Sequence, residues 1–402
     1  MLRTRAALAA LLLAACSSGP PVAERRRADL DVLVESVTTL HPSPFSARPE
    51  GEWRAAVAAA RARAGDVSDD EFRFLVGTLA NLGDRNGHGG VFPTDQPASV
   101  GMWPLRLYEF ADGWHVVSAH DGALVGARVE AIGGRPVAEV AAALAPMVPR
   151  DNEHSLRARL ATYLVVPAFL RGAGLAAGPL TVVDASGARR DVSPPTVAPA
   201  EYARLAGLDV PQIPLALPRP PYAPPDDWWW SVRRGDALVV GYERVLGEMP
   251  DGRQLRRFTD RLRADVAAHR TRVVVVDVRR NPGGETGSAT FLVSLLRELR
   301  TERRIPVRVL VSRATYSAAS LVFSRLRGEV RFYGEATGGG SSTFGNPTSR
   351  TLPHSGIVVQ IAGAGADGLA TPIPAIEPDV PVAVTWRDWS RGVDAVLDAA
   401  LR

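Results

Sequence analysis

The chain has 402 residues, a formal net charge of +4 and 46% hydrophobic residues, a composition typical of a globular protein rather than a disordered or fibrous one. Its length allows two or three domains with buried cores. All 47 basic residues are arginine, so mechanisms that need a lysine amine are excluded, and their scattered placement gives nucleic-acid binding little support.

The first residues differ from the rest of the chain. Arg3 and Arg5 precede an apolar run too short to span a bilayer, and the run ends in "LAAC" at Cys16. This resembles a bacterial lipoprotein signal, in which residues 1–15 are removed and Cys16 is lipidated. An ordinary secretory signal is the alternative, but Cys16 is the only cysteine, and a lone exported thiol is otherwise a liability. We therefore expect an exported lipoprotein, tethered to a membrane in the periplasm or at the cell surface.

Residues 16–100 have helical periodicity followed by a glycine-rich turn. The spacing of apolar residues predicts helices in "ADLDVLVESV" and "GEWRAAVAAARARAG". A third helix is predicted to begin at Ser68, because Ser68 and Glu71 have the spacing of a capping box. The turn "GDRNGHGG" follows and carries His88.

Residues 101–210 contain short strand patterns. Within them, residues 126–137, "GARVEAIGGRPV", resemble the core of a PDZ-type module, in which an apolar strand meets a tight glycine turn, and a helical pattern follows. Residues 211–225, "PQIPLALPRPPYAPP", predict a connector between domains, because proline is excluded from helix interiors and central strands.

Residues 226–402 alternate between strand and helix patterns. The strands "ALVVGYERV", "RVVVVDV" and "VRVLVS" are separated by the helical stretches "DGRQLRRFTDRLRADVAAH" and "TFLVSLLRELR". Continuous apolar strands of this kind are buried on both faces of a parallel sheet. We therefore predict an α/β domain with a mainly parallel sheet.

Two loops leave adjacent strands of that sheet at their carboxyl ends, where ligands bind in open α/β sheets. In "DVRRNPGGETG", Gly283 and Gly284 let the backbone approach a substrate and offer N–H groups to an oxyanion. In "SRATYSAAS", Ser317 opens a predicted helix, and Ala318 N–H is a further oxyanion donor. Ser317 is thus a candidate nucleophile, with a simple helix N-cap as the alternative.

Four segments, "VVVVDVRRNPGG", "SRATYSAAS", "GEATGGG" and "EPDVPV", occur in the order and spacing of the S41 serine peptidases, the group of tail-specific and tricorn-type proteases. The resemblance extends through the N-terminal helices, the histidine turn and the PDZ-like segment, so it covers nearly all of the chain after the signal. It implies a crotonase/ClpP-like α/β core with an N-terminal helical segment and a PDZ-like module. It also implies a peptide or protein substrate, no cofactor, and Ser317 as the nucleophile.

The same resemblance bears on the general base. The tail-processing branch uses a Ser–Lys dyad, which this chain excludes. The tricorn-like branch takes a histidine from a "GDGHT"-like loop, and "GDRNGHGG" matches that loop in place, with His88 as its histidine. Histidine suits general-base work at neutral pH. The loop departs from the family pattern in the extra residues before Gly87 and in Gly89, where threonine is usual. His354 is the alternative base, because it lies in the same C-terminal unit as Ser317.

A third residue is needed to orient the imidazole. Glu377 in "IEPDVPV" is the first candidate, and Glu335 and Asp84 are the alternatives. No metal chemistry is expected, because the sequence has no HExxH motif and no Cys/His cluster.

Together these features predict a lipid-anchored serine endopeptidase that works outside the cytoplasm. The PDZ-like module would bind an extended peptide by adding it to a sheet edge. The alternative is a catalytically inactive member that keeps the fold as a peptide-binding scaffold. The departures in the His88 loop and Ser320, where the family has glutamate, favour that alternative.

Overall fold

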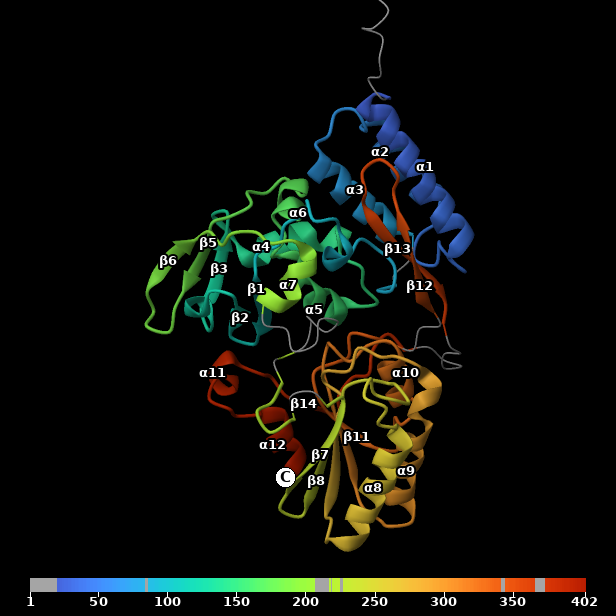
Figure 1. The fold of residues 1–402 in the computed structure, drawn as a ribbon, viewed down its shortest axis with the longest axis vertical. Coiled ribbons are helices and arrows are strands. Elements are labelled where there is room, and N and C mark those ends of the chain that lie inside the picture. Colours follow the sequence, from blue (N-terminus) through green and yellow to red (C-terminus); the bar gives the residue numbers. More distant parts are fainter. Residues whose placement is uncertain are drawn as a thin grey trace, which may run out of the picture.

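The structure, a computed structural model, describes residues 20–83, 86–206, 217, 219–224, 227–340, 344–365 and 373–402. Cys16 and the proposed signal lie outside these ranges, as does most of the proline-rich connector. Figure 1 shows two bodies: a first body (residues 20–83 and 86–206) above a second body (residues 227–340 and 373–402). Within the described ranges, no helix combines the length and apolar character that a membrane span requires.

The first body begins with three helices, as the sequence predicts. They are α1 (Val22–Leu40), α2 (Glu50–Ala62) and α3 (Asp69–Leu82). The predicted capping box is present: Glu71 N–H donates to Ser68 Oγ, and Ser68 N–H donates to the Glu71 carboxylate. Apolar side chains from one face of each helix, including Leu30, Trp53 and Val76, pack into one core.

An antiparallel sheet and four more helices complete the first body. The sheet has the strand order β1-β2-β3-β5-β6, with β4 paired to β3. The strands are β1 (Leu105–Phe110), β2 (Gly113–Ala119), β3 (Arg128–Ile132), β4 (Arg135–Pro136), β5 (Leu180–Val183) and β6 (Arg189–Val192). The helices are α4 (Val137–Leu144), α5 (Glu153–Tyr163), α6 (Pro167–Gly172) and α7 (Pro199–Leu205). The predicted strand, glycine turn and helix of residues 126–148 are present as β3, β4 and α4, whereas the PDZ-like assignment stays a prediction.

The second body is built on a six-stranded sheet of order β14-β11-β10-β9-β8-β7. All pairs are parallel except β7 with β8, which agrees with the predicted mainly parallel α/β sheet. The strands are β7 (Trp229–Arg234), β8 (Ala237–Tyr242), β9 (Val273–Asp277), β10 (Val307–Val311), β11 (Arg331–Gly334) and β14 (Val380–Pro381). The helices are α8 (Leu255–Ala268), α9 (Thr290–Thr301), α10 (Ala318–Ser324), α11 (Trp386–Trp389) and α12 (Ala395–Leu401).

The valines of β9 explain why this strand reads as a continuous apolar run. Val274 and Val276 pack in the core beneath α8 and α9, whereas Val273 and Val275 pack in a second core with side chains of α12. The sheet is therefore covered on both faces, and its carboxyl edge, where loops leave β9 and β10, points toward the first body (Figure 1).

A hairpin from late in the chain joins the first body instead of the second. Strands β12 (Phe344–Thr351) and β13 (Val358–Ala364) form a separate two-stranded sheet that lies beside α1 and α3 in Figure 1. Leu352, Ile357, Val359 and Ile361 are buried in the core of the first body. The sequence boundary at residue 226 therefore does not separate the two cores, because this segment returns to pack on the N-terminal helices.

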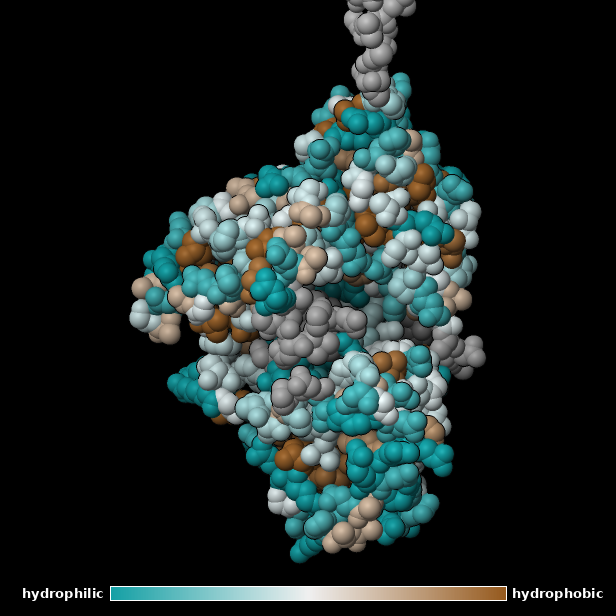
Figure 2. All heavy atoms as spheres, viewed as in Figure 1, coloured by the Kyte–Doolittle hydropathy of each residue, from teal (hydrophilic) through white to brown (hydrophobic). Residues whose placement is uncertain are grey.

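On the face shown in Figure 2, apolar residues lie scattered among polar ones over both bodies. The large hydrophobic side chains that are exposed in the described ranges, Val22, Val125, Phe291 and Val393, come from separate elements.

Candidate active site

Ser317 lies at the sharp turn between β10 and α10. Its backbone has φ 51° and ψ −128°, a left-handed conformation that residues with a Cβ rarely adopt. The preceding loop is fixed by two hydroxyls, because Ser312 Oγ donates to Arg279 O at 2.7 Å and Thr315 Oγ1 donates to Val278 O at 2.8 Å. A strained strand-to-helix turn of this kind raises a serine hydroxyl clear of the backbone.

The N-cap interpretation of Ser317 does not hold in the structure. Ser317 occupies the N-cap position of α10, but its side chain makes no capping hydrogen bond to the helix. Its hydroxyl is directed elsewhere, toward a histidine of the first body.

The loop after β9 lies against Ser317. Asn281 organises this loop: its amide donates to Tyr242 O at 2.7 Å, and its backbone O accepts from Tyr316 N–H at 3.0 Å. Gly283 has φ 109°, and a Cβ there would lie 2.7 Å from Ser317 Cβ and 2.9 Å from Ala318 N. Glycine is therefore required for this close approach.

The histidine loop of the first body is held at both ends. Gly87 N–H donates to Asp151 Oδ1 at 2.8 Å, and Asp151 lies just before α5. Gly90 and Gln360 exchange two backbone hydrogen bonds of 2.8 and 2.9 Å, which tie the loop to β13. The hairpin that returns to the first body thus helps to position His88.

Ser317 and His88 meet across the boundary between the two bodies. His88 Nε2 lies 2.9 Å from Ser317 Oγ, although 229 positions separate the two residues in sequence. Both side chains are half-buried. This distance is within the range over which a base accepts a hydroxyl proton.

Among the described residues, two oxygen atoms lie within hydrogen-bond reach of the other ring nitrogen of His88. Asn86 Oδ1 lies 3.0 Å from His88 Nδ1 and also accepts the His88 backbone N–H at 2.7 Å. Tyr316 Oη lies 3.4 Å from the same Nδ1, and the Tyr316 and His88 rings pack with their centroids 5.0 Å apart. Asn86 is only 4% exposed, and in the described part of the chain its amide nitrogen is buried without a hydrogen-bond acceptor.

Tyr316 is in turn held by a carboxylate and a guanidinium. It is hydrogen-bonded to Asp151, and the Arg159 guanidinium lies 5.0 Å from the centre of its ring. Burial, and then the Asp151 carboxylate, raise the pKa of Tyr316 well above its usual range, so the phenol stays protonated.

The carboxylates predicted for the third position lie elsewhere or outside the described residues. The Glu377 side chain is 74% exposed, and its Oε1 lies 3.9 Å from His154 Nε2 rather than beside His88. Glu335 accepts from Tyr108 Oη at 3.2 Å. Asp84 lies outside the described residues. The structure therefore corrects the placement of Glu377, because in the C-terminal segment this side chain points to α5 and to solvent.

The alternative base also lies away from Ser317. His354 sits at the tip of the β12–β13 hairpin, where its backbone N–H donates to Asp29 Oδ1 at 2.9 Å. Because the hairpin packs on the first body, His354 does not share a body with Ser317 as the sequence order suggested.

Two of the three expected oxyanion donors remain available in the structure. In the described part of the chain, Gly284 N–H and Ala318 N–H have no hydrogen-bond acceptor. Gly283 N–H, by contrast, donates to Asn281 Oδ1 at 2.9 Å. The prediction of Gly283 as an oxyanion donor is therefore wrong. Its role in the site is to let the loop after β9 approach Ser317 closely.

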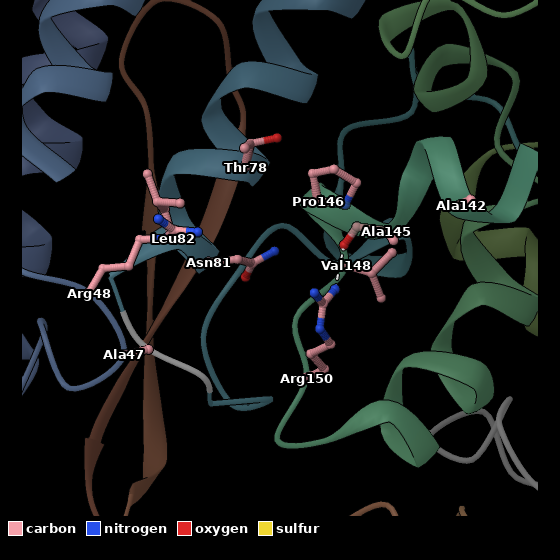
Figure 3. Close-up of a pocket in the computed structure, with 10 residues that line it drawn as sticks. All are labelled: Ala47, Arg48, Thr78, Asn81, Leu82, Ala142, Ala145, Pro146, Val148 and Arg150. Atoms are coloured by element: carbon pink, nitrogen blue, oxygen red, sulfur yellow. Dashed lines mark hydrogen bonds between the residues drawn. The ribbon is translucent and has the colours of Figure 1, made fainter. Parts of the chain in front are cut away.

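A separate cavity of about 350 Å³ opens between the end of α3 and the segment after α4 (Figure 3). Asn81 points into it, and Arg150 lies across it with Nη1 donating to Ala145 O at 2.7 Å. Neither Ser317 nor His88 lines this cavity. Over the described ranges, no group of three or more His, Cys, Asp or Glu side chains is arranged to hold a metal ion.

Sequence reasoning missed three residues around His88: Asn86, Tyr316 and Asp151. Asn86 had a signal, because it lies among the extra residues that distinguish this loop from the family pattern. Tyr316 is adjacent to Ser317 in sequence, but the direction of its side chain depends on the strained turn at Ser317, which the sequence does not show. Asp151 had no signal, because 64 positions separate it from Gly87.

Comparisons with known proteins bear on the fold. No family model and no curated protein matches the sequence. Mature CPAF matches with a TM-score of 0.63 and 14% identity over 94% of this chain and 96% of that chain. Mature CPAF complexed with lactacystin matches with the same TM-score and identity over 94% of this chain and 98% of that chain. A putative S41 protease from Bacteroides fragilis has a TM-score of 0.36 and 14% identity over 79% of this chain and 85% of that chain.

At these identities the comparisons speak to the fold and not to the activity. The match to mature CPAF spans both bodies, so it covers the relation between the sheet of the second body and the helices of the first. This chain therefore shares the fold of mature CPAF over both bodies, whereas the S41 membership that its four sequence segments predict stays a prediction.

Proposed function

We propose that this protein is a serine peptidase with Ser317 as nucleophile and His88 as general base. The observation that carries the proposal is the 2.9 Å separation between His88 Nε2 and Ser317 Oγ. A serine in a left-handed turn, free of any capping bond and paired with an imidazole, has the arrangement of an activated nucleophile.

The geometry supports an acyl-transfer sequence. Ser317 Oγ attacks the carbonyl carbon of a peptide bond while His88 Nε2 takes the hydroxyl proton. The carbonyl oxygen becomes an oxyanion, which the N–H groups of Ala318 and Gly284 stabilise. His88 then gives the proton to the leaving amine as the C–N bond breaks. Water, activated by the same imidazole, hydrolyses the acyl-enzyme and restores Ser317.

We propose further that the enzyme is exported and lipid-anchored at Cys16, and that it acts on peptides or proteins outside the cytoplasm. The basic start, the short apolar run and the lone cysteine support this proposal. In a bacterial host, the full chain should fractionate with membranes and incorporate labelled fatty acid. A Cys16→Ser chain that stays membrane-bound and acylated would contradict the anchor.

The catalytic proposal is tested by labelling the full chain, held in detergent, with a fluorophosphonate and locating the adduct by peptide mass spectrometry. We expect an adduct on Ser317 that is lost in Ser317→Ala and slowed by 10²-fold or more, on the order of a general-base contribution, in His88→Ala. His269→Ala is a matched control, because His269 is exposed at the end of α8.

Each other outcome has a definite meaning. A folded wild-type chain that binds peptides without labelling or turnover would favour the inactive-scaffold alternative. Labelling that survives His88→Ala at the wild-type rate would refute His88 as the base. Lactacystin, with which one mature CPAF structure is complexed, can be tested as a second ligand of this site.

A further inference from the structure

We propose that Asn86, together with the Tyr316–Asp151 pair, takes the part of the third catalytic residue by fixing the proton of His88 on Nδ1. These are positioning residues, because they act on Ser317 only through the imidazole. The inference concerns the same site and rests on the proposed function, but part of its test does not require activity.

The orientation of the Asn86 amide follows from its backbone contact. The atom of this amide that lies 2.7 Å from the His88 backbone nitrogen must be an acceptor, because a backbone N–H only donates. That atom is therefore the oxygen, and the usual ambiguity between the two ends of an amide is removed. The same oxygen lies 3.0 Å from His88 Nδ1.

An acceptor at this distance determines the tautomer. Two lone pairs do not attract each other, so Nδ1 carries the hydrogen and donates it to Asn86 Oδ1. Nε2 is then left with a lone pair, and it is Nε2 that faces the Ser317 hydroxyl at 2.9 Å. An amide oxygen plays this part in proteases of the Cys-His-Asn type.

Tyr316 strengthens the same arrangement. The pKa of Tyr316 is raised by burial and by Asp151, so its O–H stays protonated and donates to the Asp151 carboxylate. Tyr316 Oη accepts a hydrogen bond from Arg159, and its other lone pair can accept from His88 Nδ1–H, 3.4 Å away. The negative charge of Asp151 thus lies two hydrogen bonds, through the Tyr316 hydroxyl, from the ring that must carry a positive charge during the reaction.

Asp151 makes two contacts in this arrangement, one with Tyr316 and one with the His88 loop. Besides Tyr316 it holds the Gly87 N–H at 2.8 Å, one residue from His88. Arg159 is the cation beside it: its guanidinium lies 5.0 Å from the centre of the Tyr316 ring and lowers the pKa that burial and Asp151 raise. Among the described residues, the charged groups that act on Tyr316 are the Asp151 anion and the Arg159 cation, both on or just before α5.

The first measurement reads the tautomer directly and needs no substrate. Nitrogen-15 NMR of the full histidine-labelled chain in detergent, with His88 assigned by its loss in His88→Ala, distinguishes a protonated Nδ1 from a protonated Nε2. We expect Nδ1 protonated at neutral pH, and a mixture of tautomers in Asn86→Ala. A protonated Nε2 in the wild-type chain would overturn the inference whether or not the enzyme is active.

The second measurement compares fluorophosphonate labelling rates across pH. Asn86→Ala should slow labelling by 10-fold to 10²-fold, because a base in the wrong tautomer cannot accept the proton. Asn86→Asp should keep most of the labelling rate at neutral pH. A carboxylate beside Nδ1 favours the imidazolium, however, so the acidic limb of the plot of labelling rate against pH should move to higher pH by about one unit. A merely structural residue would not shift that limb.

Tyr316→Phe isolates the contribution of Asp151, because it keeps the ring and removes the hydroxyl. We expect a several-fold slower rate and an acidic limb displaced to lower pH, whereas Tyr333→Phe, a buried tyrosine on β11, serves as the matched control. Unchanged rates and limbs in both Asn86→Ala and Tyr316→Phe would overturn the inference. So would a Glu377→Gln chain that slows as strongly as His88→Ala.

Failure of the proposed function gives a different result. If the wild-type chain does not label at all, the catalytic proposal fails, while the NMR measurement still decides where the His88 proton lies. If the wild-type chain labels on Ser317 and the Asn86 variants behave like it, the catalytic proposal stands and only the positioning inference fails.

Discussion

Gly87 shows how closely the residues around His88 are packed. A Cβ built on Gly87 would overlap Tyr316 Oη and would lie 2.9 Å from Arg159 Nη2. Residue 87 must therefore be glycine for the Tyr316 hydroxyl to reach both Asp151 and His88. Gly89, two residues later, is different, because its Cβ would meet its neighbours at 3.4 Å or more.

Gly87→Ala should therefore slow Ser317 labelling by at least 10-fold and destabilise the first body by about 1–3 kcal/mol, the usual cost of overpacking. Gly89→Ala, which adds the same methyl group where there is room, should stay within about 0.5 kcal/mol of the wild-type chain. Labelling rates and thermal unfolding measure the two effects. Equal effects of the two substitutions would show that the loop, rather than the contact with Tyr316, sets the rate.

The residues that sequence predicted and those it missed differ in kind. Ser317 and His88 were predicted because each lies within a short motif whose chemistry is local. Their partners were not, because Asn86 acts through an amide oxygen whose direction depends on the fold, and Asp151 meets the loop across 64 positions. Glu377 lay in a matching motif, yet its side chain faces His154. A motif places a backbone segment, whereas side-chain direction depends on tertiary contacts.

At the scale of elements, helix α12 is fastened to the sheet by a buried charge cluster. Asp394 caps the helix through Leu397 N–H and accepts two hydrogen bonds from Arg279, of 2.8 and 2.7 Å. Arg279 also pairs with Asp277 at the end of β9, and all three side chains are less than 10% exposed. The C-terminal helix is thereby tied to the loop that carries Gly283 and Gly284.

This cluster predicts a pH-dependent stability. Burial opposes ionisation, but Arg279 more than offsets it, and the pKa of Asp394 falls to about 2. A carboxyl with a lowered folded pKa stabilises above its unfolded value of about 3.8 and loses that contribution as pH falls toward 2. Asp394→Asn should therefore cost on the order of 2 kcal/mol at pH 7 and almost nothing near pH 2.

Urea unfolding of the second body at pH 7, 4 and 2.5 measures the difference between the two chains. Asp398→Asn is the control on the same helix, because Asp398 is exposed. A wild-type advantage over Asp394→Asn that is the same at pH 7 and pH 2.5 would contradict the coupling between Asp394 and Arg279.

The sequence predicted the strands and helices of the second body but not where the β12–β13 hairpin packs. The strands and helices of the second body follow one another along the chain, so local periodicity was enough to find them. The β12–β13 hairpin buries Leu352, Ile357 and Val359 against helices that lie about 300 positions earlier. Periodicity shows that such a segment has an apolar face but not which core covers it.

At the scale of the whole molecule, the contact between His88 and Ser317 exists only because the two bodies dock. His88 belongs to the first body and Ser317 to the second, so their 2.9 Å separation depends on contacts between the bodies. Arg313, four residues before Ser317, is one such contact: its guanidinium lies 4.1 Å from the centre of the Tyr108 ring and donates to Glu109 O. Asn152 is another, because its amide donates to Thr337 O and Pro374 O.

Arg313→Leu should therefore slow Ser317 labelling by 10-fold or more, because a displacement of about 1 Å between catalytic groups costs as much as 10²-fold. The loss should arise from the contact between the bodies rather than from the nearby turn. A double-mutant cycle separates these causes: if the contact matters, adding Tyr108→Leu to Arg313→Leu should slow labelling little further. Arg308→Leu, which removes a guanidinium packed on Tyr333 within the second body, should leave the rate within about twofold. Full additivity of Arg313→Leu and Tyr108→Leu would place the effect in the turn and leave the docking of the two bodies without a part in catalysis.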